Sequence, residues 1–222
     1  MTDTVTPRSA KGVRTRARLL DAAREVFEAL GFLEARVSDI VERAGLSHGS
    51  FYHYFDSKEQ VFRAVAETLE AQLTAPADEQ ERERERDGDE GGDGTAPAPA
   101  SEYARILAAN RLYLERYRAH ARIMGVIEEV SRYDDHVNQA RMRRQKHFAD
   151  RAERAIRRLQ DAGEADPAVD PGIAALALGS MVARTAELWL VEGWADYDLD
   201  VVAEQVTRLW AGALGLPVPP RS

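Results

Sequence analysis

The sequence predicts an all-α protein, with an N-terminal helical domain followed by a C-terminal helical bundle. Three observations lead to this prediction. Apolar residues recur at helical spacing along nearly the whole chain of 222 residues, no stretch shows the alternation of a half-buried strand, and the composition changes abruptly at Pro76. Residues 76–101 are rich in acidic residues, glycine and proline and contain no large apolar side chain, so we expect a flexible acidic linker there.

Composition bounds the class of protein. There is no cysteine, which excludes disulfides and thiolate metal ligands. The N-terminus lacks the apolar run of a signal peptide, and the longest apolar stretch, residues 173–191, is interrupted by Arg184 and Glu187. We therefore expect a cytoplasmic protein that needs no cofactor and does not enter a membrane.

The net charge of −8 conceals a basic N-terminus. Residues 1–20 carry five basic side chains against the single acid Asp3: Arg8, Lys11, Arg14, Arg16 and Arg18. Such an arm can bind phosphate although the whole chain is acidic, because salt screens charges beyond roughly 8 Å. The alternative is that these side chains form a solvated helix face.

The N-terminal domain is expected to contain a three-helix unit, followed by a longer fourth helix. An apolar stripe runs from Leu19 to Leu30 and ends at Gly31, a usual residue after a helix. Two short helices follow, at about 38–44 and 49–55. Ser57 then caps a longer helix, whose apolar stripe comprises Val61, Phe62, Val65 and Leu69.

The two short helices are joined by "AGLS", which predicts a helix-turn-helix over about residues 36–55. Gly45 permits the turn between them. In this motif the second helix enters the major groove of double-stranded DNA. Phe51 and Phe55 are expected to point inward. Tyr52, His53 and Tyr54 cannot all face inward from one short helix and suit phosphates and base edges; the alternative is that the aromatic residues only pack a small domain.

Three segments, "TRARLLDAAREVFEALGF", "SDIVERAGLSHGSFYHYF" and "DSKEQVFRAVAE", closely resemble the DNA-binding domain of TetR-family transcriptional repressors. The resemblance covers about residues 13–73. It implies a set of residues at or near DNA: Ser47, His48, Gly49, Ser50, Tyr52, His53, Tyr54 and Lys58, the last matching the family's phosphate-contacting lysine.

The chain departs from the family pattern at two places. Ala35 and Arg36 stand where the family usually has two threonines. Ser38 is therefore expected to cap the second helix, and Ser38 and Arg36 are expected to lie at the DNA, where Arg36 contacts phosphate by charge. His48 stands where the family favours lysine or arginine, which implies DNA affinity that is weaker and more sensitive to pH.

Residues 102–216 resemble the family in layout only, as a domain for ligand binding and dimerisation. The helix at 173–191 is apolar on more than one face, which predicts burial on both sides and hence a homodimer interface. The expected interface residues are Met181, Arg184, Glu187, Leu188, Trp189 and Trp210. The alternative is that this helix lies in the middle of a monomeric core.

The candidate pocket for a small effector comprises Tyr103, Asn110, Tyr113, Tyr117 and Met124. An asparagine on an apolar stripe needs a hydrogen-bond partner, which a ligand, a neighbouring helix or water could supply. The apolar lining indicates a hydrophobic or amphipathic effector.

These features predict a DNA-binding transcriptional regulator, a repressor released from a palindromic operator by its effector. One alternative is a helical protein-interaction adaptor without DNA binding, which would leave Tyr52, His53 and Tyr54 unexplained. The other is an enzyme, and against it the sequence shows no phosphate-binding glycine loop and no nucleophile elbow. The histidines at 120, 136 and 147 form no spacing typical of a metal site, so no metal is expected.

Overall fold

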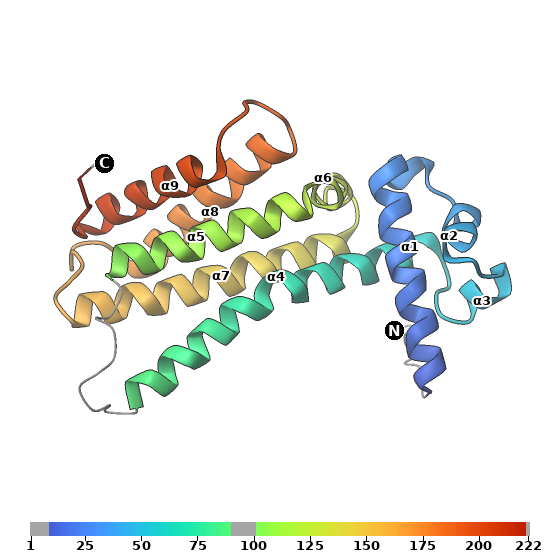
Figure 1. Cartoon of the computed structure of the whole chain (residues 1–222), viewed down its shortest axis with the longest axis horizontal. Coiled ribbons are helices and arrows are strands. Elements are labelled where there is room, and N and C mark those ends of the chain that lie inside the picture. Colours follow the sequence, from blue (N-terminus) through green and yellow to red (C-terminus); the bar gives the residue numbers. More distant parts are fainter. Residues whose placement is uncertain (1–8, 90–100, 221–222) are drawn as a thin grey trace. The chain divides into compact units, whose positions relative to one another are not determined.

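The computed structural model describes residues 9–89 and 101–220, which form nine α-helices and no strand (Figure 1). The prediction of an all-α fold is confirmed. The helices are α1 (Ala10–Glu34), α2 (Val37–Ala44), α3 (His48–Tyr52), α4 (Lys58–Asp89), α5 (Glu102–Ala119), α6 (Ala121–Val130), α7 (Asp135–Asp161), α8 (Pro171–Leu190) and α9 (Leu199–Leu214).

The chain divides into two compact units. Unit 1 comprises Met1–Ala71 and Arg122–Arg141, and unit 2 comprises Gln72–Ala121 and Met142–Ser222. The sequence predicted an N-terminal domain of residues 13–73 and a C-terminal domain of 102–216. The observed units differ from the predicted domains in the segment 122–141, which packs with the N-terminal helices although it is distant from them in sequence.

Three phenylalanine side chains form the centre of unit 1. Phe27 of α1 meets Phe62 of α4 edge-on, with ring centroids 4.9 Å apart, and Phe32 lies 5.0 Å from Phe62. Phe27 and Phe62 are completely or almost completely buried. Gly31, at φ 73°, interrupts the helical geometry of α1 as its sequence position predicted, and one further turn brings Phe32 into this cluster.

The corner between α6 and α7 is attached to unit 1 by an ion pair. Arg63 of α4 donates to both carboxylate oxygens of Asp134, with Nε–Oδ2 at 3.0 Å and Nη2–Oδ2 at 2.8 Å. Asp134 also accepts the backbone N–H groups of His136 and Val137, the first amides of α7. One carboxylate therefore caps α7 and ties it to α4, while Tyr133 lies against the Phe32 ring at 6.5 Å.

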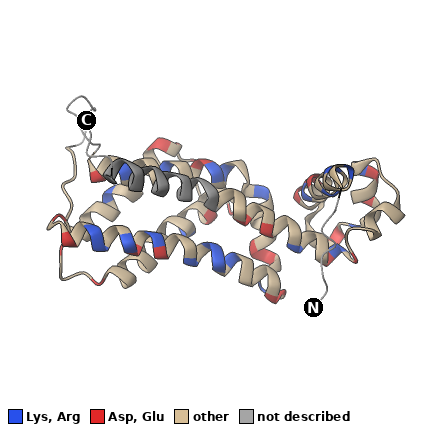
Figure 2. Ribbon diagram, turned by 90° about the horizontal axis from the view of Figure 1, so that it is seen from below, with Lys and Arg blue, Asp and Glu red and all other residues tan. Residues whose placement is uncertain are grey.

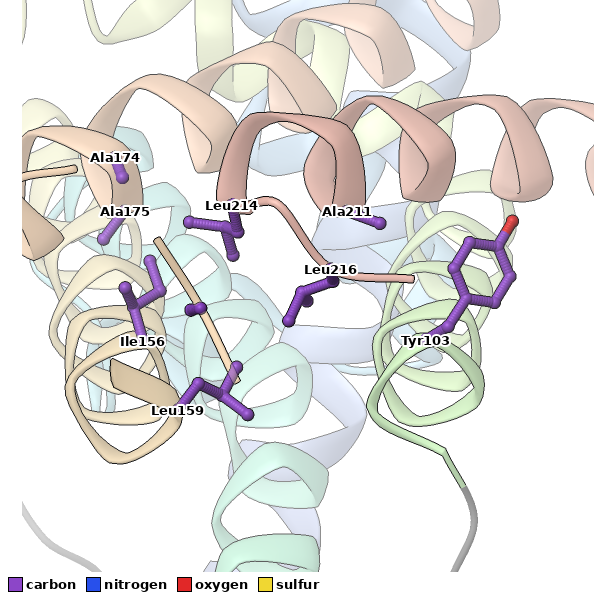
Figure 3. Packing of buried hydrophobic residues seen from close by; sticks show 9 residues of the cluster. Tyr103, Ile156, Leu159, Ala174, Ala175, Ala211, Leu214 and Leu216 are labelled. Carbon is purple, nitrogen blue, oxygen red and sulfur yellow. The ribbon is translucent and has the colours of Figure 1, made fainter. Parts of the chain in front are cut away.

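Unit 2 is built around a second apolar cluster contributed by several helices (Figure 3). Asp170 caps α8 by accepting the Ile173 N–H at 2.8 Å, and Pro171 occupies its first turn, where no amide donor is needed. The cluster comprises Tyr103, Ile156, Leu159, Ala165, Ala174, Ala175, Ala211, Leu214 and Leu216. The small residues on α8 and α9 allow close packing of these helices.

The helix α4 is longer than the sequence predicted. It continues to Asp89, so the expectation of a flexible linker is wrong for residues 76–89. Glutamate, glutamine and arginine have high helix propensity, and an existing helix extends at little cost, which outweighs the lack of apolar residues. The rest of the expected linker includes residues 90–100, which lie outside the described residues.

The pair of Arg63 and Asp134 makes the stability of unit 1 depend on pH. Burial alone would raise the pKa of Asp134, but the hydrogen bonds from Arg63, Val137 and His136 lower the pKa below its ordinary value of 3.8. A lowered pKa in the folded state means that the stabilisation is present above about pH 4 and is lost as the pH falls through the folded-state pKa.

We expect Asp134→Asn to lower the free energy of unfolding at pH 7 by roughly 1–3 kcal/mol, because it removes a charge-assisted hydrogen bond. The difference from wild type should shrink in acid, below about pH 4. Urea unfolding followed by circular dichroism, with hydrogen exchange of residues 130–137, measures both effects. Glu25→Gln, which breaks the exposed pair with Arg43, is the matched control and should cost less than about 1 kcal/mol; equal losses for both variants would contradict the assignment.

Candidate nucleic-acid interface

The turn between α2 and α3 has the backbone geometry that the sequence predicted. Gly45 adopts the left-handed conformation, with φ 60° and ψ 43°. Its N–H donates to the carbonyl of Glu42 at 3.0 Å, and the N–H of Leu46 donates to that of Val41 at 2.9 Å. These bonds end α2 and turn the chain directly into α3, forming a helix-turn-helix.

Two phenylalanines hold α3 in place. Phe51 is completely buried and Phe55 almost so, and their ring centroids lie 5.8 Å apart. Both point inward, as predicted. Ser47 caps α3 by accepting the Ser50 N–H at 3.2 Å, and the two serine hydroxyl groups lie 3.1 Å apart.

The other side chains of this segment face outward. Tyr52 is 56% exposed, and its ring meets Phe51 edge-on. His48, Gly49 and His53 are exposed. Tyr54 is half-buried, with its ring centroid 4.9 Å from that of His53. The exposed surface of α3 thus presents a phenol and two imidazoles on a rigid support, groups that can bind both phosphates and base edges.

The start of α2 differs from the prediction. The expectation that Ser38 caps this helix is wrong, because α2 begins at Val37 and its N-cap is Arg36. The Asp39 carboxylate accepts the Arg36 N–H at 2.9 Å, which completes the cap without a side-chain acceptor at residue 36. Arg36 and Ser38 are both exposed, and their expected contacts with DNA stay predictions.

Lys58 has an intramolecular position that the sequence did not reveal. Its Nζ donates to the carbonyl of Phe32 at 2.7 Å and to that of Leu33 at 3.1 Å, and lies 4.6 Å from the centre of the Phe32 ring. In the free protein the ammonium therefore caps the last carbonyls of α1. The predicted phosphate contact would require Lys58 to leave or share these acceptors.

Other basic side chains of unit 1 are also held by the protein. Arg18 donates through Nη2 to the Ala44 carbonyl at the end of α2, and Arg43 pairs with Glu25 at 2.6 Å. The guanidinium of Arg16 lies over the Phe55 ring at 5.3 Å. Both signs of charge occur on the helices of this unit (Figure 2), and the exposed Lys11 and Arg14 remain as cations of the N-terminal arm.

The pocket residues predicted from the sequence are distributed over both units. Asn110 is buried and donates to Thr207 Oγ1 at 3.0 Å, and the Tyr103 hydroxyl donates to Glu204 Oε1 at 2.8 Å. Burial, followed by the bond to Glu204, raises the pKa of Tyr103. Of the partners that the sequence left open for Asn110, the structure selects a neighbouring helix. Figure 3 shows the Tyr103 hydroxyl turned away from the apolar cluster.

The other three pocket residues lie in two different units. Tyr113 and Tyr117 of α5 have ring centroids 6.0 Å apart, and Phe148 of α7 lies 5.5 Å from Tyr113. This aromatic group belongs to unit 2. Met124 is completely buried and belongs to unit 1. The sequence analysis did not identify Phe148, Glu204 and Thr207 as neighbours of the pocket residues. The spacing of Glu204 and Thr207 did indicate that they share a face of α9.

Of the six residues predicted for the dimer interface, Trp189 alone is buried within unit 2, and the other five are partly or fully exposed. Trp189 is buried, Trp210 packs against the apolar cluster, and Met181 and Leu188 are half-buried. Arg184 and Glu187 pair with each other at 2.5 Å, one of the two pairings that their spacing allowed. The exposed large apolar side chains of α8 and α9 are Ile173, Leu176, Val201 and Leu209.

The fold and the α2–α3 geometry define a helix-turn-helix protein. Residues 19–65 match the family described as bacterial regulatory proteins, tetR family. The HTH-type transcriptional regulator YdgC of Bacillus subtilis is 53% identical over 53 residues, which are 24% of this chain and 27% of YdgC. SrpR of Pseudomonas putida is 40% identical over 57 residues, 26% of this chain and 27% of SrpR. The chain thus spans about a quarter of the length of these relatives.

Solved structures resemble the whole chain at low identity, which shows the fold. SmeT, the repressor of the Stenotrophomonas maltophilia multidrug efflux pump SmeDEF, has a TM-score of 0.67 at 24% identity and covers 93% of this chain and 94% of its own. FadR of Bacillus subtilis, in complex with stearoyl-CoA, has a TM-score of 0.69 at 17% identity, covering 89% and 98%.

We expect Lys58→Met to lower the free energy of unfolding of unit 1 by roughly 1–3 kcal/mol, because it removes a charged donor to two carbonyl groups and keeps an apolar stem on Phe32. Hydrogen exchange of residues 28–34 measures the loss. Lys11→Met, at an exposed position of α1, is the control. If Lys58 instead binds phosphate, its removal would flatten the salt dependence of DNA affinity by about one unit of slope.

Proposed function

We propose that the protein is a homodimeric transcriptional repressor that binds a near-palindromic operator through α2 and α3. The observation that carries this proposal is the geometry of α3. Phe51 and Phe55 anchor it, while Tyr52, His48 and His53 are exposed. A protein-interaction adaptor would not need this arrangement.

A gel shift with DNA from upstream of the protein's own gene tests the proposal. A retarded, near-palindromic site with half-sites about 34–36 Å apart is the expected result, because each subunit of a dimer presents one α3 to successive major grooves. Absence of binding to any promoter-proximal DNA at low salt would favour the adaptor or the enzyme.

Tyr52→Ala should reduce discrimination between the operator and random DNA by about 5–150-fold, the equivalent of 1–3 kcal/mol for a contact with a base edge. Affinity for random duplex should change little. Competition binding with a randomised operator pool measures the change. Tyr197→Ala, which removes an equally exposed tyrosine from unit 2, is the matched control, and an equal loss of discrimination for both variants would contradict the role of Tyr52.

The support for a dimer is the exposed apolar surface on α8 and α9. Ile173 is 69% exposed, Leu176 63% and Leu209 58%, which is unusual for side chains on two packed helices. By length and composition α8 could also cross a membrane, the one described helix that could, but it carries the pair Arg184–Glu187. We assign this surface to a two-fold interface with a second copy of the chain in the cytoplasm.

Leu176→Glu and Leu209→Glu should each convert the dimer to monomers, because an interface would bury an unpaired charge. Neither side chain is needed for the fold of unit 2, since both are exposed, whereas Trp210→Glu would damage the core cluster. Light scattering measures the mass. Val13→Glu, at an exposed apolar position of α1, is the control and should stay dimeric. Intact dimers for both leucine variants would place the interface elsewhere.

The proposed effector is a hydrophobic or amphipathic small molecule that binds unit 2. Support comes from the aromatic group of Tyr113, Tyr117 and Phe148, which offers ring surfaces rather than unpaired charges. FadR, of similar fold, holds stearoyl-CoA, an amphipathic molecule. Mass spectrometry of ligands retained by the purified protein would identify the compound.

A further inference from the structure

The exposed surface of α3 contains no permanently charged cation. Residues 47–55 include neither lysine nor arginine, and the two side chains there that can become cationic are His48 and His53. Both are exposed. Within the part of the chain that the structure describes, neither imidazole has a hydrogen bond or an ion pair, and the His53 ring lies perpendicular to the Tyr54 ring, with centroids 4.9 Å apart.

Three permanent cations of the helices around α3 are held by contacts within unit 1. Arg18 donates to the carbonyl that ends α2, Arg43 pairs with Glu25, and Lys58 caps α1 through two carbonyls. Each contact restrains a basic side chain that would otherwise be available to a phosphate. The exposed Lys11, Arg14 and Arg36 are outside α3 and supply an attraction that does not vary with pH.

The charged groups on the elements around α3 have both signs. They are Arg16 and Arg18 of α1, Glu42 and Arg43 of α2, and Asp56, Lys58 and Glu59 at and before the start of α4. Arg43 is neutralised by Glu25, whereas Arg18 and Lys58 keep their charge but direct it at carbonyl groups, so the exposed acids Glu42, Asp56 and Glu59 offset part of the remaining attraction for a phosphate. A positive charge on α3 itself would strengthen that attraction.

We infer that His48 and His53, as imidazolium ions, are the cations with which α3 binds DNA phosphates, so that DNA binding takes up protons. This inference rests on the proposed function. Imidazole changes its charge between about pH 5 and 8, and a neighbouring phosphate favours the charged form. By linkage, affinity for DNA falls as the pH rises, with a slope equal to the number of protons taken up, at most two. Acidification of the cytoplasm would therefore increase operator occupancy.

Fluorescence anisotropy with the upstream DNA and with a random duplex, between pH 6.0 and 8.5 at constant ionic strength, tests the inference. The expected result is an affinity for both duplexes that falls by about tenfold or more over this range. The salt dependence should also be steeper at pH 6.0, by up to about one unit of slope for each imidazolium. Calorimetry in two buffers of different ionisation enthalpy counts the protons directly.

Three variants make the test specific. The double variant His48→Gln, His53→Gln should bind with little pH dependence, and His48→Lys should retain at pH 8 much of the affinity that wild type has at pH 6. Both histidines are exposed, so the fold tolerates these changes. The matched control is His136→Gln, at an exposed histidine of α7 in unit 1, which should keep the wild-type pH dependence.

The possible failures are distinguishable. Unchanged pH dependence in the double variant overturns the inference and leaves the proposed function intact. A second outcome is that the double variant loses the pH dependence while the salt dependence of wild type does not change with pH. This outcome would place the imidazoles on base edges and overturn the assignment to phosphates. No DNA binding by wild type at any pH overturns the proposed function, and the inference with it.

Discussion

The molecule depends first on the anchoring of a helix that is too short to be stable alone. With five residues, α3 completes barely one turn, and the cost of nucleating such a helix exceeds what its own hydrogen bonds return. Burial of Phe51 and Phe55 supplies the missing stability, at about 1.5–3 kcal/mol for each side chain. Since these two residues fix the orientation of α3, they also determine that Tyr52 and the two histidines face outward. The burial of the two phenylalanines therefore also exposes the polar side chains of α3 to solvent.

Several basic residues of unit 1 stabilise its fold through contacts with groups of the same unit. Lys58 and Arg18 donate to carbonyl groups at the ends of α1 and α2, where the helix dipole favours a cation, and Arg63 holds the α6–α7 corner through Asp134. A sequence count of positive charge near a helix-turn-helix thus overestimates the cations that are available to DNA. The exposed cations of the described part of unit 1 include Lys11, Arg14 and Arg36.

Local patterns in the sequence were enough to predict the helices of unit 1 and the inward direction of Phe51 and Phe55. Spacing determines which side chains share a helix face, and Gly45 marks the turn without knowledge of the partner. The contacts of Lys58 and Asn110 could not be predicted, because their acceptors are 25 or more residues away and depend on tertiary packing. For the same reason the sequence did not show that 122–141 joins the N-terminal unit. The sequence did not predict the full length of α4, because residues 76–89 lack apolar side chains although their glutamates and arginines favour a helix.

The bonds between α5 and α9 restrict how an effector could act on unit 2. Asn110 and Thr207 are buried and satisfy each other, while Tyr103 is bonded to Glu204, which also accepts from Arg208. A ligand that separated these helices would leave buried polar groups without partners, at a cost of about 1–3 kcal/mol for each. An effector that enters beside the aromatic rings of Tyr113 and Phe148 avoids this cost. A coupling of only about 1–3 kcal/mol already changes DNA affinity 5–150-fold, so a modest shift of these helices is sufficient and rupture of the α5–α9 bonds is not required.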